Sequence, residues 1–349
     1  MFSTYKNEDV TILLKDITGL VTPLGTKERE KRIQSGVHYS EMLPLEYEPS
    51  QAYLKTFFRA LDLYSEYTAQ AVAGVSEQIW TDRQGAPVLV SLARAGTPIG
   101  ILIKHFIERK YRVNIPHYTI SIIRGKGIDR NAMRQILSRH RPESIQFVDG
   151  WTGKGAIQRE LKLAMQDFPG VDSGLAVLSD PAGVASKTGT RDDFLIASSC
   201  LNATVSGLLS RTFYRSDIIG PEDYHGAAFY HELEGQDLTY RFIDSVEAFF
   251  SEKLKVPEKP ADLTEGADEA AEICKAFGVR DINFVKPGIG EATRVLLRRM
   301  PWKVLVHSMD DPVHLGHLYQ LAQEKGVPLE VYPLRRYRAC GIIREMADQ

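Results

Sequence analysis

The sequence predicts an α/β protein in which a parallel sheet is followed by a small second α/β unit. Three stretches with the apolar pattern of buried strands, 87–92, 118–123 and 145–148, are each followed by a loop and a helix-like run. Repeated strand and helix patterns of this kind require crossover connections, which make the strands parallel. A charged stretch with two prolines, 252–266, then precedes a shorter pattern of helices and strands at 267–349.

Composition and charge set few limits on function. The formal net charge is −2, so no overall bias indicates a polyanionic partner, although residues 286–349 carry ten Lys/Arg and seven Asp/Glu, a balance of +3. The three cysteines are far apart in the chain, which argues against a disulfide framework or a zinc cluster and favours a cytoplasmic location. We find neither a signal-peptide pattern nor an apolar run of membrane-spanning length, so no membrane partner is expected.

Residues 1–80 precede the first strand of this series and are expected to form a hood over the sheet. Within them, 10–14 has the pattern of a short strand, and 52–79 has the apolar spacing of a long amphipathic helix. The stretch 34–44 is loop-like and rich in hydrogen-bonding groups, which is consistent with a packed surface loop or with a loop that faces a substrate. The second interpretation assigns three of its side chains to substrate contact: His38, Tyr39 and Glu41.

The stretch 145–164 carries the strongest functional signal. A strand of four residues ends in Asp149, and the chain then turns through glycines into a helix. Glycines let the backbone approach a phosphate, which the first helical N–H groups and the helix dipole can hold, while Asp149 can contact a ribose hydroxyl or a magnesium ion beside it. The turn is not a Walker loop, because Val148 stands where that motif has its first glycine. The predicted phosphate-binding residues are Thr152, Gly153, Lys154 and Gly155.

Two further strand ends carry basic or glycine-containing turns. The strand at 87–92 leads into 93–100, which contains Arg94, Ala95 and Gly96. The strand at 118–123 leads into the basic loop 124–129, which contains Arg124 and Lys126. Because ligands of open α/β sheets bind at the carboxyl ends of the strands, we expect all three turns to face one site.

The remainder of the first unit is less informative. A strand is predicted at 174–178 and a polar segment at 186–193. A helix containing Cys200 is predicted at 197–210, and helical periodicity continues at 224–250. The C-terminal unit is predicted to contain helices at 267–277, 289–299 and 313–325 and strands at 282–285, 303–306 and 329–332.

The three turns, in this order, resemble those of the type I phosphoribosyltransferase family over about 87–210. In that family a strand-end acid and a Thr-Gly turn hold the ribose and 5′-phosphate of phosphoribosyl pyrophosphate, and Asp149, Thr152 and Gly153 match this signature. The sequence departs from it at Gly150, where the family usually has a second acid. The resemblance implies a Rossmann-like parallel sheet, phosphoribosyl pyrophosphate as co-substrate and Mg²⁺ bound indirectly through Asp149.

The resemblance also implies roles for the other turns. The 93–96 turn looks like the family's pyrophosphate loop, and 124–127 looks like its flexible catalytic loop. Departure of pyrophosphate leaves an oxocarbenium-like sugar, so Mg²⁺, Arg94 and Lys126 would neutralise the charge of the leaving group. The implied catalytic residues are Asp149, Arg94, Arg124 and Lys126, and Ala95 and Gly96 would contact the co-substrate.

A narrower resemblance is to a bacterial phosphoribosyltransferase-like family associated with tellurite-resistance and stress gene clusters and labelled StiP, a cysteine protease. A peptidase would need Cys200 to be reactive, but its neighbours are apolar, and a buried cysteine usually acts as a small hydrophobic residue. Only the fold could bring His225 or His231 to it. The stretches that carry this resemblance are 34–44, 90–100, 121–129 and 145–156.

The C-terminal unit resembles the Pelota and kink-turn-binding ribosomal protein fold, on the stretch 288–294 and on 334–341. In that family the start of a helix reads bent RNA; here Gly290 stands in place of an asparagine and Arg294 in place of a lysine. The alternative is a small α/β domain that uses these residues for capping and packing. The implied RNA-binding residues are Lys286, Gly288, Glu291, Thr293 and Arg294.

We therefore predict a phosphoribosyltransferase-like domain at 1–251, a linker at 252–266 and a Pelota-like RNA-binding domain at 267–349. The preferred function is Mg²⁺-dependent transfer between phosphoribosyl pyrophosphate, a small sugar phosphate, and a nucleobase-like or RNA-derived acceptor, with structured RNA as a second partner. The alternatives are a non-catalytic nucleotide or RNA sensor, which Gly150 favours, and a cysteine peptidase. The acceptor, the direction of reaction and a homo-oligomeric state stay open.

Overall fold

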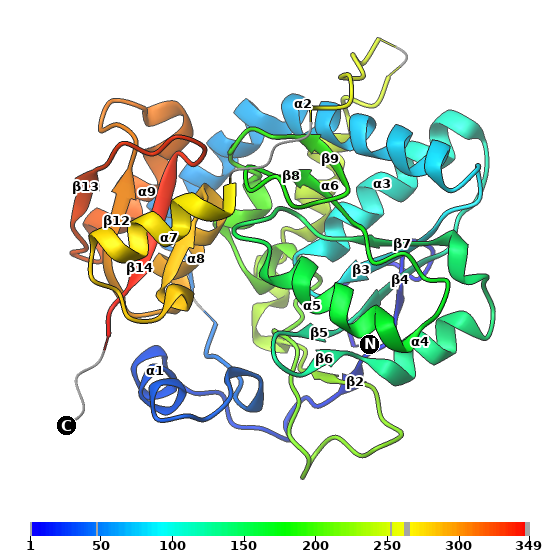
Figure 1. Cartoon of the computed structure of the whole chain (residues 1–349), viewed down its shortest axis with the longest axis horizontal. Coiled ribbons are helices and arrows are strands. Elements are labelled where there is room, and N and C mark those ends of the chain that lie inside the picture. The colour runs from blue at the N-terminus through cyan, green and yellow to red at the C-terminus, as the bar shows by residue number, and fades with distance from the viewer. Residues whose placement is uncertain (1, 47, 252, 262–265, 346–349) are drawn as a thin grey trace.

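The structure is a computed structural model that describes residues 2–46, 48–251, 253–261 and 266–345. Figure 1 shows a larger body built around a sheet and a smaller body beside it, formed by the C-terminal part of the chain. Among the described residues, no helix combines the length and apolar character needed to cross a membrane. The predicted linker falls partly on residues 252 and 262–265, which lie outside the described part, so its limits stay a prediction.

The larger body contains a sheet of six parallel strands, as the sequence predicts. Their order across the sheet is β1-β4-β3-β7-β8-β9, and every pair of neighbours is parallel. The fold class is therefore confirmed. The strands are β1 (Thr11–Ile12), β3 (Val88–Leu92), β4 (His117–Ile120), β7 (Ile145–Val148), β8 (Leu175–Ser179) and β9 (Lys187–Thr190).

Helices cover both faces of this sheet, which explains why its central strands are continuously apolar. Side chains alternate along β3, so that Leu89 packs into the core on one face and Val88 and Val90 into the core on the other. On the Leu89 face lie α2 (Gln51–Asp82), α3 (Gly96–Tyr111) and α6 (Thr239–Glu247), and on the Val90 face lie α4 (Arg130–Leu137) and α5 (Ala156–Ala164).

The strand order locates the point where a ligand is expected. Taken in chain order, β3 is followed by β4 on one side and then by β7 on the other, so the connections diverge between β3 and β7. In sheets of this kind the crevice outside the carboxyl ends of two such strands is the usual ligand site. The turns after these strands are the two that the sequence singles out, 93–96 and 149–155.

Short elements complete this body. The hood contains α1 (Thr26–Gln34) and a 3₁₀ turn at Tyr39–Glu41, and β2 (Lys15–Asp16) pairs with β10 (Gly226–Ala227). The third turn is a small hairpin of β5 (Ile122–Ile123) and β6 (Gly127–Ile128). Further 3₁₀ turns of this body lie at Pro142–Ser144, Met165–Asp167, Ala197–Cys200, Ala203–Val205 and His231–Gln236, and one of the smaller body lies at Ile282–Phe284.

Two predictions for this body are wrong. The expected helix at 197–210 is a pair of 3₁₀ turns, because the backbone leaves helical conformation at two places. Leu201 is extended, with φ of −123° and ψ of 177°, and Asn202, with ψ of −109°, is not helical either. Gly207 and Leu208 have positive φ, 67° and 55°. Helical structure at 224–250 is confined to 239–247 and a 3₁₀ turn, since residues 226–227 pair with β2. The polar segment at 186–193 contains the edge strand β9, whose residues Lys187–Thr190 lack the apolar pattern of the inner strands.

The smaller body is a four-stranded sheet with helices on both faces. Its strands, in the order β11-β14-β12-β13, are β11 (Val285–Pro287), β14 (Ala339–Ile343), β12 (Pro301–Val306) and β13 (Leu329–Val331). One face packs on α8 (Ile289–Arg298) and α9 (Pro312–Glu324), and the other on α7 (Gly266–Ala276). Because α9 also packs on α2, and Tyr64 donates a hydrogen bond to the carbonyl of Val313, the two bodies share a continuous apolar core.

Candidate functional site

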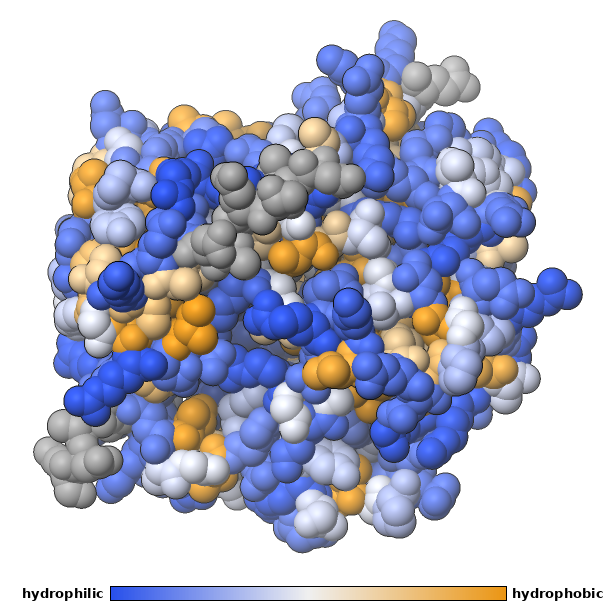
Figure 2. Space-filling model, in the orientation of Figure 1, coloured by the Kyte–Doolittle hydropathy of each residue, from blue (hydrophilic) through white to orange (hydrophobic). Residues whose placement is uncertain are grey.

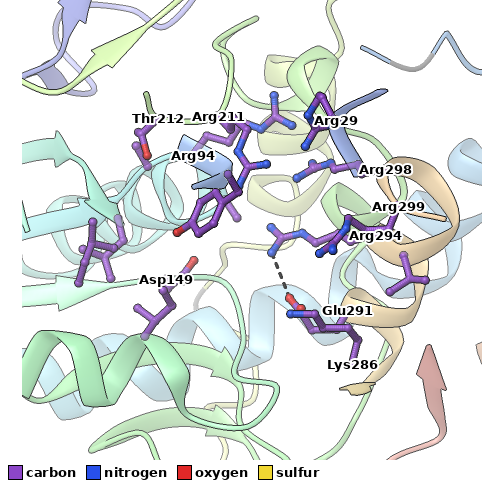
Figure 3. Close-up of a pocket in the computed structure, with 17 residues that line it drawn as sticks. Arg29, Arg94, Asp149, Arg211, Thr212, Lys286, Glu291, Arg294, Arg298 and Arg299 are labelled. Carbon is purple, nitrogen blue, oxygen red and sulfur yellow. Dashed lines mark hydrogen bonds and ion pairs between the residues drawn. The ribbon is translucent and has the colours of Figure 1, made fainter. Parts of the chain in front are cut away.

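A cavity of about 270 Å³ lies at the carboxyl ends of β3 and β7, where α8 of the C-terminal domain covers them. In Figure 2 the molecule is hollowed between the two bodies, and hydrophilic residues surround the opening. Charged side chains from the hood, the sheet and α8 project into this space (Figure 3). Seven basic residues, Arg29, Arg94, Arg211, Lys286, Arg294, Arg298 and Arg299, line it together with two acidic ones, Asp149 and Glu291.

Asp149 occupies the position that the sequence predicts, directly after β7. One carboxylate oxygen accepts the N–H of Gly150 at 2.8 Å, and the side chain faces the cavity. Burial raises the pKa of Asp149 to about 6, against the opposing effect of Arg294. The ionised carboxylate is therefore poorly solvated and gains from a cation or a hydroxyl donor placed beside it.

The glycine turn after Asp149 also reaches the cavity region. Gly155 begins α5 with φ of 75°, a conformation that side-chain-bearing residues rarely adopt. The N–H groups of Gly153, Lys154 and Gly155 donate to none of the residues that the structure describes. A smaller hollow of about 100 Å³ is lined by this turn and by Arg124 and Arg294.

Two side chains of the turn have structural partners instead of facing a phosphate. The Thr152 hydroxyl donates to the carboxylate of Asp180, and its N–H donates to the carbonyl of Ser179. Lys154 donates to the carbonyls of Ile282 and Val285 in the C-terminal domain, and burial lowers its pKa to about 7. Thr152 therefore fixes the turn and Lys154 joins the domains, and the ligand contacts predicted for these two residues stay a prediction.

Arg94 lies at the base of the cavity, on the turn after β3. Its side chain is 6% exposed, pairs with Glu46 at 2.9 Å and donates to the carbonyl of Leu209 at 2.8 Å. Its second terminal nitrogen, Nη2, is buried without a hydrogen-bond partner among the described residues. Ala95 lines the cavity beside it, and Gly96 is needed because a Cβ there would lie 2.5 Å from the carbonyl oxygen of Val148.

The hood holds the third turn. The N–H of Arg124 donates to the Tyr39 hydroxyl at 2.9 Å, His38 Nε2 lies 3.0 Å from the carbonyl of Arg124, and Lys126 pairs with Glu41 at 3.6 Å. Of the three predicted hood residues, only Tyr39 lines the cavity. His38 and Glu41 instead hold the loop, and the substrate contacts predicted for them stay a prediction.

Lys126 does not line the cavity either, and its catalytic role stays a prediction. Arg124 extends the other way, and its Nη1 donates to Asn283 of the C-terminal domain at 2.8 Å. The basic loop is thus held between the hood and the second domain.

The predicted RNA-binding residues face the first domain. Lys286, Glu291 and Arg294 line the cavity, where Glu291 pairs with Arg294 at 3.2 Å. Thr293 is fully buried and donates to the carbonyl of Ile289, and the RNA contact predicted for it stays a prediction. Gly288, which is also buried, has φ of 98° and donates to the carbonyl of Ala339.

The docking of the two domains explains the glycine that replaces the family's asparagine. A Cβ at Gly290 would lie 2.5 Å from the ring of Trp151, so only glycine permits this approach. The guanidinium of Arg294 lies 4.3 Å from the centre of the same ring, at a distance typical of cation–π contacts. Asp193 of the first domain accepts the N–H of Ile289 at 3.0 Å and that of Arg338 at 2.8 Å, and so satisfies the start of α8.

Sequence reasoning missed four arginines of the cavity. Arg299 makes two hydrogen bonds to Glu30, at 2.7 and 2.9 Å, and Arg211 lies 4.4 Å from the centre of the Tyr39 ring. Arg29 is 3% exposed, and its Nε has no partner among the described residues. None of these positions belongs to a motif; the one signal is the pair of arginines at the end of α8, Arg298 and Arg299.

Comparison with known proteins identifies the family. Residues 3–247 match the family described as tellurite-like stress resistance cysteine protease StiP. The cysteine protease StiP of Acinetobacter baylyi is 36% identical over 369 residues, which cover 98% of this chain and 94% of that protein. The chain belongs to the StiP family. Residues 264–345 also match the PELOTA RNA-binding domain family.

Two solved structures of a hypoxanthine-guanine phosphoribosyltransferase from Bacillus anthracis are also similar. They are 17% and 16% identical, and each match covers 35% of this chain and 71% of the other with a TM-score of 0.25. At that TM-score the likeness bears on neither the fold nor the function of this StiP family member.

The cysteine protease in the family description would require a reactive thiol, and neither fully buried cysteine has the surroundings of one. Burial raises the pKa of both Cys200 and Cys340 to about 12. His225 and His231, which the peptidase alternative would need beside Cys200, contact Ser121 and Glu234 instead, at 2.8 and 3.0 Å. Within the described residues, no cysteine thiol is hydrogen-bonded to a histidine.

Proposed function

We propose that this StiP family member binds a phosphorylated ribose of the phosphoribosyl pyrophosphate class in the cavity and transfers its ribosyl group to an acceptor. The observation that carries this proposal is Nη2 of Arg94, which is buried without a hydrogen-bond partner among the described residues. Arg94 follows β3 and Asp149 follows the neighbouring strand β7, and both side chains line the same cavity. A buried guanidinium nitrogen without a partner is costly, and a pyrophosphate oxygen is the acceptor that suits it best.

The charge of the lining supports the same ligand class. Seven basic and two acidic residues surround one cavity, which favours a ligand with several negative charges. In the transfer, the C1–O bond to pyrophosphate breaks and pyrophosphate leaves with the electron pair. A lone pair of the acceptor forms the new bond to C1, and the acceptor's proton passes to solvent. Arg94 would stabilise the departing charge, and the free N–H groups of the 153–155 turn would hold the 5′-phosphate.

Magnesium fits this site only together with the substrate. Asp149 is a single carboxylate, and the described residues contain no group of three or more His, Cys, Asp or Glu that could hold a metal ion. Mg²⁺ commonly binds through one or two carboxylates plus substrate phosphates, so Asp149 would hold it with the oxygens of the ligand. Bound there, Mg²⁺ would supply charge neutralisation for the pyrophosphate.

Gly150 stands where the phosphoribosyltransferase family usually has a second acid, so ligand binding and transfer need separate tests. A Cβ at this position would lie 3.8 Å from the carbonyl oxygen of Ala95 and from Ile99, an ordinary contact, so the site has room for a side chain but no second acid. Calorimetry with phosphoribosyl pyrophosphate, with and without Mg²⁺, tests the binding. Release of pyrophosphate on adding candidate acceptors then distinguishes an enzyme from a sensor, and absence of binding by the folded protein would refute both.

RNA binding is a second candidate function, supported by the match of residues 264–345 to the PELOTA RNA-binding family. Because Lys286 and Arg294 line the cavity, RNA that uses them would compete with the phosphate ligand. We expect saturating pyrophosphate to weaken binding of a kink-turn RNA to the full chain. An RNA affinity that pyrophosphate leaves unchanged would show that any RNA site lies elsewhere.

A further inference from the structure

Three arginines that line the cavity have no role in the proposed binding of a ribose pyrophosphate. Figure 3 shows Asp149 on one side of the cavity and Arg29 and Arg298 on the other, with Arg94 between them. Arg29 comes from α1 of the hood, Arg211 from the loop after the 3₁₀ turn at Ala203–Val205, and Arg298 from α8. We call these three residues the distal arginines.

The distal arginines lack the carboxylates that their neighbours have. Glu46 pairs with Arg94, and Glu30 pairs with Arg299. Within the described part of the chain, none of the three distal arginines forms an ion pair with a carboxylate. The Nε of Arg29 is buried without any partner, and Arg298 donates to the amide oxygen of Asn202.

Three unpaired cations in a buried space repel one another. Burial and the neighbouring Arg29 lower the pKa of Arg211 to about 9. The pKa of Arg298 is lowered as well, first by burial and then by Arg94 and Arg294. Glu30 and Glu46 offset part of this charge, but the first is already paired with Arg299 and the second with Arg94. Cations therefore outnumber carboxylates in this part of the cavity, and an anion from outside would stabilise the arrangement. Guanidinium groups bind phosphate monoesters with several hydrogen bonds at once.

We propose that the distal arginines form a second anion subsite, which binds the phosphate of the acceptor. The acceptor of the transfer is then a phosphate-bearing molecule, a nucleoside monophosphate or a phosphorylated RNA end, and not a free base. That the bound phosphate belongs to an acceptor rests on the proposed function, whereas the subsite itself rests on the unpaired arginines. The acceptor keeps its phosphate, because the transfer changes only the bonds at C1 of the ribose and the bond between the attacking acceptor atom and its proton.

Calorimetry on the full-length protein tests the subsite with two probes. Ribose 5-phosphate reports on the Asp149 side, and adenosine 5′-monophosphate is then titrated into protein saturated with ribose 5-phosphate. We expect one further equivalent of the monophosphate to bind, and adenosine to bind at least tenfold more weakly. A short RNA with a 5′-phosphate, compared with the same RNA with a 5′-hydroxyl, shows whether an RNA end or a mononucleotide is preferred.

Variants then separate the two sides of the cavity. Arg29→Gln and Arg298→Gln should each weaken the monophosphate about 10- to 100-fold, as expected for the loss of a charge-assisted hydrogen bond, and leave ribose 5-phosphate within about twofold. Asp149→Asn should do the reverse. Arg32→Gln is the matched control, because Arg32 lies on the same helix as Arg29 but is half exposed and pairs with Glu28.

Three results would overturn the inference. The first is that adenosine or 5′-hydroxyl RNA binds as tightly as the phosphorylated form, and the second is that ribose 5-phosphate and the monophosphate displace each other one for one. The third is that folded Arg29→Gln and Arg298→Gln proteins bind the monophosphate with wild-type affinity. Because the two variants lie on different elements, a folding defect in one leaves the other as the test. Binding of the monophosphate that depends on Arg29, without binding of ribose 5-phosphate, would support the subsite and refute the proposed transfer.

Discussion

Replacing Asp149 by asparagine should stabilise the ligand-free protein at neutral pH while weakening its ligand binding. Burial raises the pKa of Asp149 from 3.8 to about 6, so the folded state binds this proton more tightly than the unfolded state does. The stabilising effect of the bound proton is fully present below about pH 4 and is lost as the pH rises through about 6. Above that pH the wild-type protein contains a poorly solvated carboxylate, which the asparagine variant lacks.

The size of the effect follows from the two pKa values. A difference of about 2 pH units corresponds to about 3 kcal/mol. Asp149 is only partly buried in the cavity, and solvent screening reduces this to about 1–2 kcal/mol. Denaturant unfolding of the wild type and of Asp149→Asn at pH 4 and pH 7.5 measures it, and the variant should be more stable only at pH 7.5.

Two controls sharpen the measurement. Asp62→Asn, on the exposed face of α2, should change stability by less than about 0.5 kcal/mol at either pH. Ribose 5-phosphate should bind Asp149→Asn at least tenfold more weakly than the wild type. If the variant is equally stable or less stable at pH 7.5, the carboxylate is well compensated in the folded protein, and the argument that it awaits a cation or hydroxyl donor fails.

Further predictions concern the domain interface, the thiol and the pyrophosphate site. Gly290→Ala places a Cβ 2.5 Å from the Trp151 ring, so it should loosen the docking of α8 and speed proteolysis between the domains. Gly316→Ala is the control, because a Cβ there has nothing within 4 Å, and it should be neutral or stabilising. Equal proteolysis of both variants would contradict this prediction. Cys200→Ser should retain wild-type ligand binding but lose some stability, because the thiol is fully buried. Abolished turnover in the folded variant would restore the protease interpretation. Arg94→Ala should weaken pyrophosphate about tenfold or more and ribose 5-phosphate much less, and equal losses would make Arg94 structural.

Local patterns in the sequence were sufficient where an element is buried on both faces or begins at a marked turn. The inner strands at 88–92 and 145–148 are apolar except for Ser91 and Gln146 and are buried throughout, and the 32-residue helix α2 has a regular apolar stripe and a Ser50 N-cap. The same reasoning missed β9, because an edge strand keeps one side polar. It also predicted a helix at 197–210, because an apolar run does not reveal that the backbone at Gly207 and Leu208 turns left-handed.

The sequence by itself determined the parallel sheet, the acid at the end of β7 and the glycine turn that follows it, because each depends on neighbouring residues in one short stretch. The tertiary structure alone decided which cations share the cavity. Arg29, Arg94, Arg211 and Arg298 lie on four separate elements, and no local pattern relates them. It also decided that Lys154 joins the domains. An arginine's charge is the same at every position in a sequence, whereas its partner, its burial and therefore its need for an anion depend on what the fold places around it.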